Sequence, residues 1–125
     1  MPSLVPADLL RFVDLFNAGA YWESHELLEG PWRKSRSEFY HGLILYASAF
    51  VHARRGNAVG VAAQLAKAER SLTSYRPHYL GLDVDAILAV AARARTRAAL
   101  GDAGASPPPL ELSPPLLRGS EPELR

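Results

Sequence analysis

The residues best suited to chemistry are a histidine and two glutamates in the first third of the chain. His25, Glu26 and Glu29 lie in a segment with helical periodicity. At 100° per residue, His25 and Glu29 share one face of such a helix, and Glu26 lies about 100° away at its border. An imidazole and a carboxylate one helical turn apart can pair with each other or bind one divalent cation.

The same helical face carries aromatic side chains, namely Tyr21, Trp22 and Trp32. A bare carboxylate buried among them would cost on the order of several kcal/mol, so Glu29 needs a partner. Two interpretations stay open. The first is a buried structural pair with His25. The second is a site for a metal ion or a small molecule, with these aromatic residues as its lining; for the tryptophans, core packing is the alternative.

A third donor could come from the next helix, predicted over residues 37–55. His41 and His52 fall on one polar stripe of it, but they are eleven residues apart, roughly 16 Å along the axis, so they cannot ligate one ion together. A short turn joins the two helices, which predicts an antiparallel pair and places His52 nearer to His25.

We therefore predict a metal site of His25, Glu29 and His52, with Glu26 or water as the fourth ligand. Zinc, manganese or iron fits such nitrogen and oxygen donors. The pattern does not establish whether the protein is an enzyme.

Helical periodicity recurs up to about residue 100 and predicts about five helices. Their expected ranges are residues 6–16, 20–34, 37–55, 57–75 and 83–100. Pro31 should kink or end the second helix, because it lacks an amide hydrogen and crowds the carbonyl of Leu27. No strand-like alternation is present. Short connections imply antiparallel neighbours, so the fold class is all-α, a compact antiparallel helical bundle.

The composition changes near residue 105, where prolines become frequent. We expect one helical domain over residues 1–105 and a Pro-rich extended or disordered tail over residues 106–125. Leu110, Leu112, Leu116 and Leu117 could lie along the domain or on a neighbouring subunit.

Bulk properties exclude several classes of function. The chain has 125 residues, a formal net charge of +1 and no cysteine. Disulfides, thiolate metal sites and cysteine nucleophiles are therefore excluded, and no general charge excess favours nucleic acid or a membrane surface. No segment has the roughly 20 apolar residues that span a bilayer, and no signal peptide is evident. We expect a cytoplasmic protein that binds neither nucleic acid nor membrane and can form a homodimer.

Four blocks in order resemble the domain-of-unknown-function family 309 (DUF309). They are FNAGAYWESHELLE (16–29), GLI (42–44), HARRGN (52–57) with Gly60, and GLDV (81–84). The resemblance covers about residues 8–90, and its hallmark H-x-x-x-E-x-x-W is matched by His25, Glu29 and Trp32. It implies a compact all-helical fold and a proposed metal-binding role for the motif, with no assigned reaction.

Three hypotheses of function follow. The first is a metal-binding helical protein that holds a divalent ion between the second and third helices. The second is a non-catalytic interaction module or homodimer in which His25 and Glu29 form a buried structural pair. The third is a small-molecule pocket lined by Tyr21, Trp22 and His25.

Overall fold

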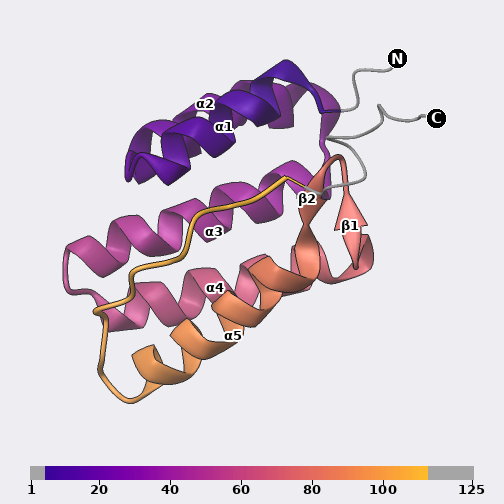
Figure 1. Cartoon of the computed structure of the whole chain (residues 1–125). Coiled ribbons are helices and arrows are strands. Elements are labelled where there is room, and N and C mark those ends of the chain that lie inside the picture. Colours follow the sequence, from indigo (N-terminus) through magenta and orange to yellow (C-terminus); the bar gives the residue numbers. More distant parts are fainter. Residues whose placement is uncertain (1–4, 113–125) are drawn as a thin grey trace.

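The computed structural model describes residues 5–112, and helices dominate this part of the chain. The elements are α1 (Ala7–Asn17), α2 (Tyr21–Ser35), α3 (Glu38–Arg54), α4 (Ala58–Leu72), a 3-10 turn (Thr73–Tyr75), β1 (His78–Tyr79), β2 (Leu82–Asp83) and α5 (Val84–Ala99). α1 and α2 lie together on one side of α3, and α4 and α5 lie on the other (Figure 1). The predicted all-α fold is confirmed.

The central helix, α3, is buried along most of its surface because its sequence is almost continuously apolar. Its buried residues are Phe39, Tyr40, Gly42, Leu43, Ile44, Tyr46, Ala47, Ala49 and Phe50. Gly42 allows α4 to approach closely, since a Cβ atom at this position would lie 2.6 Å from Leu72 Cδ2. The Ser37 side chain caps the helix by accepting a hydrogen bond from the Tyr40 amide.

Side-chain hydrogen bonds link the N-terminal part of the chain, α1 and the turn before α2, to α3 at both ends of the bundle. At one end the Tyr40 hydroxyl donates to Asp8 Oδ1 at 2.9 Å. Burial, and then this hydrogen bond, raise the pKa of the Tyr40 hydroxyl, so it stays a donor at neutral pH. At the other end Arg54 donates to the carbonyl of Gly19 at 2.5 Å, and its guanidinium lies over the Tyr21 ring.

We expected a kink or an early end of the second helix at Pro31. The early end is wrong, because α2 continues to Ser35. Proline normally restricts the preceding residue through a clash with its Cβ atom. Gly30 has no Cβ atom, so the chain can stay helical across the Gly30–Pro31 bond. The helix ends at Arg36, which adopts a left-handed conformation with φ 57°.

A second difference is the short hairpin of β1 and β2, because the sequence predicted no strand. Tyr79 pairs with Leu82 across it, and both residues of its turn have positive φ, 48° at Leu80 and 94° at Gly81. Two consecutive positive φ values are typical of the tight turns that suit a β-hairpin. Asp83 follows directly and caps α5 by accepting from the Ala86 amide.

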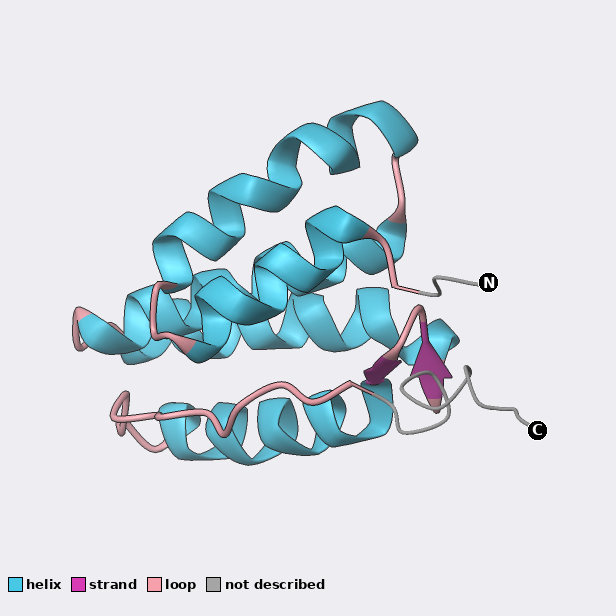
Figure 2. Cartoon of the chain, turned by 45° about the horizontal axis from the view of Figure 1, so that its top comes forward, coloured by secondary structure: helices cyan, strands magenta, loops and turns pink. Residues whose placement is uncertain are grey.

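The chain after α5 returns along the domain as an extended segment, which we call the tail (residues 102–112). It runs between α3 and α5 and ends beside β2 (Figures 1 and 2). Asn17 holds it with two hydrogen bonds: its side-chain amide donates to the Leu110 carbonyl at 2.9 Å, and its side-chain oxygen accepts from the Leu110 amide at 2.7 Å. Leu110 is buried. Residues 113–125, including Leu116 and Leu117, lie outside the described part of the chain.

In residues 5–112, no helix is both long enough and apolar enough to cross a membrane.

Replacing Asn17 with alanine should release the tail, because both hydrogen bonds to Leu110 are lost. We expect Asn17→Ala to lower the free energy of unfolding by about 1–2 kcal/mol and to accelerate hydrogen exchange at the Leu110 amide. The amide of Val61, in the core, serves as the reference. Unchanged protection of Leu110 would show that Asn17 does not hold the tail.

Replacing Gly42 with alanine should separate α3 from α4. The new methyl group would overlap Leu72, which is fully buried, and overpacking of this kind destabilises by about 1–3 kcal/mol. Chemical denaturation of Gly42→Ala, Leu72→Ala and the double variant forms a thermodynamic cycle. Gly42→Ala should lower the free energy of unfolding less in the Leu72→Ala background than in the wild type. Strictly additive effects of the two substitutions would contradict the close contact.

Candidate functional site

The predicted pair of His25 and Glu29 is present on α2. His25 Nε2 lies 3.6 Å from Glu29 Oε2, and Arg33 approaches the other oxygen of Glu29 at 3.5 Å. The side chains of His25 and Glu29 are 17% and 36% exposed. The expectation that Glu29 is buried is therefore wrong, because α2 turns Ser24 and Leu28 into the core instead. At this exposure the ion pair contributes at most about 1 kcal/mol to stability.

The two tryptophans lie beside histidines at different levels of the α2–α3 pair. The Trp22 ring stacks on His25 with centroids 5.2 Å apart, and Trp22 is 49% exposed. The Trp32 ring stacks on His41 at 4.6 Å. Both contacts orient an imidazole by stacking against an indole.

Tyr21, the third predicted lining residue, belongs to the aromatic core. Its ring lies 4.9 Å from that of Phe16 and 5.8 Å from that of Phe50. The structure therefore places Tyr21, Trp22 and Trp32 in three different surroundings.

The other two predicted ligands, His52 and Glu26, lie apart from the pair. His52 faces the start of α4, where its Nδ1 is 3.1 Å from Asn57 Nδ2. A Cβ atom at Gly60 would lie 2.6 Å from the same nitrogen, so His52 is packed against the first turn of α4. Glu26 is exposed. Among residues 5–112, no three histidine or acidic side chains form a group that could hold a metal ion.

The register of α2 against α3 indicates which residue of α3 lies nearest to His25. Trp32 meets His41, and eleven residues earlier Tyr21 meets Phe50. Interpolating between these contacts places His25 level with about residue 47. Ala47 is buried, and the partly exposed residues on either side of this level are Leu45 and Ser48. Ser48 is the polar one, and its hydroxyl accepts from Gln64 Nε2 of α4 at 3.4 Å.

Ser48 and Gln64 were not predicted as site residues. Ser48 falls on the same stripe of α3 as His41 and His52, which is the sequence signal for it. Gln64 is a single polar residue near the apolar stripe of α4, and it gives no signal of its own.

Two buried side-chain atoms have no hydrogen-bond partner in the described part of the chain. They are His25 Nδ1 on α2 and Gln64 Oε1 on α4. An unsatisfied buried polar atom costs on the order of 1–3 kcal/mol. Both therefore favour the approach of a polar group, such as water or part of a ligand, at the edge of α3.

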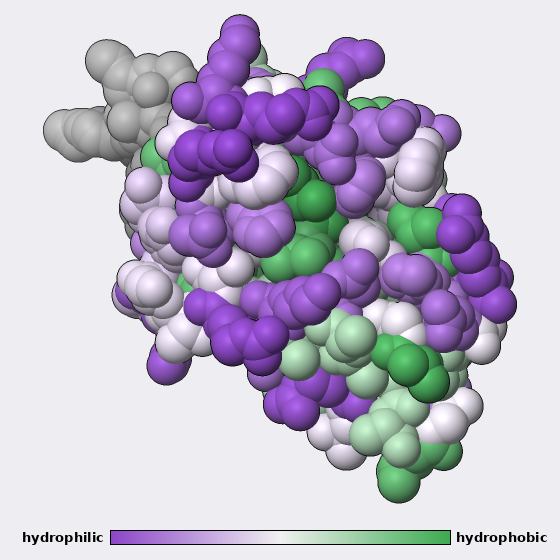
Figure 3. Space-filling view, turned by 180° about the vertical axis from the view of Figure 1, so that it is seen from behind, coloured by the Kyte–Doolittle hydropathy of each residue, from purple (hydrophilic) through white to green (hydrophobic). Residues whose placement is uncertain are grey.

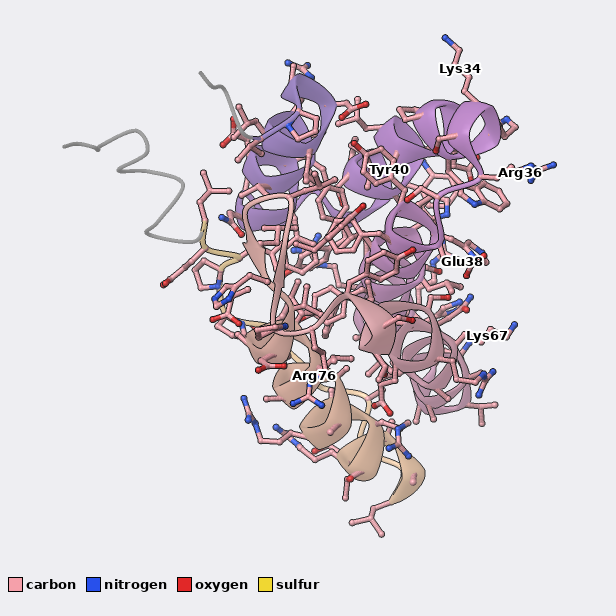
Figure 4. All side chains as sticks on the ribbon, turned by 90° about the vertical axis from the view of Figure 1, so that its right-hand side faces the viewer. Lys34, Arg36, Glu38, Tyr40, Lys67 and Arg76 are labelled. Carbon is pink, nitrogen blue, oxygen red and sulfur yellow. The ribbon has the colours of Figure 1, made fainter. Side chains whose placement is uncertain are left out.

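We call the surface around this edge the α2–α3–α4 face. Seen from behind, it has apolar surface in a central hollow and hydrophilic side chains around it (Figure 3). Lys34, Arg36, Glu38 and Lys67 point outward along one border (Figure 4). Glu38 links the helices there by accepting from the Ser71 hydroxyl at 3.0 Å. The face thus combines an apolar floor with charged borders of both signs.

Comparison with known proteins finds one family model that resembles part of the chain. Residues 9–64 match the model of the family described as Domain of unknown function (DUF309). They run from α1 into α4 and contain His25, Glu29 and Trp32, whereas residues 81–84, which also resemble the family, lie outside the match. No curated protein matches the chain. The family resemblance predicted from the sequence is thus confirmed over residues 9–64.

Proposed function

We propose that the chain binds a divalent metal ion through His25 and Glu29, at the edge of α2 on the α2–α3–α4 face. The observation that carries the proposal is the distance of 3.6 Å between His25 Nε2 and Glu29 Oε2. Two donors that each lie about 2.1 Å from a tetrahedral ion are about 3.4 Å apart. A small side-chain adjustment would therefore let both atoms bind one ion.

The chemistry of the two donors supports the same proposal. Imidazole nitrogen with carboxylate oxygen suits zinc, manganese or iron. Both side chains are partly exposed, so an ion can reach them from solvent. The stacked Trp22 ring limits rotation of the imidazole, which keeps Nε2 directed towards Glu29.

The surroundings of His25 indicate what else such a site requires. When Nε2 binds a metal, Nδ1 carries the hydrogen, and metal-bound histidines almost always donate it to an acceptor. His25 Nδ1 is buried and has no acceptor within residues 5–112. A water molecule between His25 and Ser48 would supply one. A bound ion would provide a Lewis acid with positions open to water or to a ligand, and no particular reaction is implied.

Metal binding can be tested on protein purified without a histidine tag. Zinc and manganese titrations, followed by calorimetry and elemental analysis, should give one ion per chain. Glu29→Gln keeps the shape of the side chain but weakens the donor, so we expect affinity to fall by about tenfold or more while the apo protein keeps its melting temperature.

Two further glutamates on α2 provide matched controls. Glu23→Gln changes a charge on the opposite side of the helix and should leave affinity nearly unchanged. Glu26→Gln tests whether Glu26 supplies a further ligand. Equal affinity of wild type and Glu29→Gln, or the absence of stoichiometric binding, would remove the proposal.

A second candidate function, a protein-interaction module or homodimer, is favoured by the exposed indole of Trp22. Tryptophan is enriched at the energetic centres of protein interfaces, and Trp22 is 49% exposed beside the candidate metal pair. If the face mediates self-association, sedimentation of the wild type should show a dimer, and Trp22→Ser should weaken it by about 2 kcal/mol or more. A wild-type chain that stays monomeric at high concentration would exclude the homodimer.

A further inference from the structure

Two neighbouring cavities are lined by residues of the tail together with residues of α3 and α5. The tail runs between these two helices (Figure 1). The larger has a volume of about 220 Å³ and is lined mainly by apolar side chains, among them Leu82, Ile87 and Leu110. The smaller has a volume of about 140 Å³ and includes Arg93 in its lining. Val90 and Pro108 line both. The two cavities therefore adjoin, and we call them together the tail channel.

Tyr46 supplies a polar group inside this apolar channel. It lines the larger cavity and is only 1% exposed. Its ring is held by stacking on Phe16 and by an edge contact with Phe50. Within residues 5–112 its hydroxyl has no hydrogen-bond partner, and the oxygen is not fully buried, so a molecule in the cavity can reach it. Burial raises the pKa of Tyr46, and Arg93 acts in the opposite direction, so the hydroxyl is a neutral donor.

Arg93 supplies an uncompensated charge in the lining of the smaller cavity, near enough to Tyr46 to oppose the rise in the pKa of its hydroxyl. Its two neighbours along the exposed side of α5 are paired: Arg95 donates to Glu69 at 2.9 Å, and Arg97 donates to Asp102 at 2.8 Å. Within the described residues, Arg93 has no such ion pair or hydrogen bond. It is therefore free to bind an anionic group at the smaller cavity.

Acidic residues set the orientation of an anionic ligand. Asp83 and Glu111 are among the residues that line the larger cavity, and their charges would repel a carboxylate there. The apolar end thus suits an uncharged chain, and the Arg93 end suits the charged group.

We propose that the tail channel binds a medium-chain carboxylate, with its alkyl chain in the larger cavity and its carboxylate beside Arg93 and Tyr46. An apolar cavity of about 150 Å³ holds a benzene molecule. A cavity of about 220 Å³ is therefore large enough for much of an alkyl chain of about six to eight carbons. The tail covers the channel, and the Asn17–Leu110 hydrogen bonds keep this cover in place.

The proposal can be tested by calorimetric titration of the full chain, stripped of lipid, with octanoate. We expect saturable binding of one octanoate per chain. Octanol has the same alkyl chain without the charge, and acetate has the charge without the chain, so both should bind at least about tenfold more weakly. Equal affinity for octanol and octanoate, or no saturable octanoate binding, would overturn the proposal.

Variants of α5 and α3 provide the second test. Arg93→Gln should reduce octanoate affinity by about tenfold, and Tyr46→Phe should reduce it by about fivefold. Arg95→Gln is the matched control, because Arg95 lies on the same helix but is paired with Glu69; it should leave affinity unchanged. Nuclear Overhauser contacts should join the octanoate methyl group to Ile87. Binding that is insensitive to Arg93→Gln, or contacts confined to residues outside the channel, would refute the assignment.

Discussion

The burial of α3 between two helical layers is the constraint on which the rest of the molecule depends. α1 and α2 cover one side of it, and α4 and α5 cover the other. Its small residues, Gly42, Ala47 and Ala49, let neighbouring helices approach closely, and close packing of this kind leaves few alternative arrangements. Both proposed sites adjoin α3. One edge carries His41, Ser48 and His52, and the opposite side carries Tyr46 beneath the tail.

The parts of the structure that depend on neighbours in sequence could be predicted from the sequence. Periodicity indicated the helices, and the spacing of four residues predicted the contact between His25 and Glu29, because both side chains belong to one helix. The burial of Glu29 could not be predicted in the same way. It depends on the rotation of α2 against α1 and α3, and α2 is polar around much of its circumference. Small differences in packing therefore decide which residues turn inward.

The placement of His52 and of the tail depends on longer-range contacts. His52 lies in the second half of α3, as its position in the sequence requires. The first turn of α4 comes close at Gly60, and the His52 ring lies against Asn57 there. The tail is held by Asn17, 93 positions away from Leu110. Its prolines predicted an extended chain but carried no information on the surface that it covers. The tail channel could not be predicted from the sequence either, because the pattern around Tyr46 is the same as that of any other core residue of α3.

The two proposed sites lie on opposite sides of α3 at one level, since Tyr46 and Ser48 are two residues apart and so about 200° apart around the helix. Coupling between them would require α3 to have two discrete positions. Its packing opposes this, because any shift towards α4 closes the contact between Gly42 and Leu72, and any shift away from it moves Tyr40 against Asp8. These two contacts therefore hold α3 in place between the tail channel and His25. Within the described fold, we expect the metal pair and the channel to bind independently, with α3 acting as a fixed wall between them.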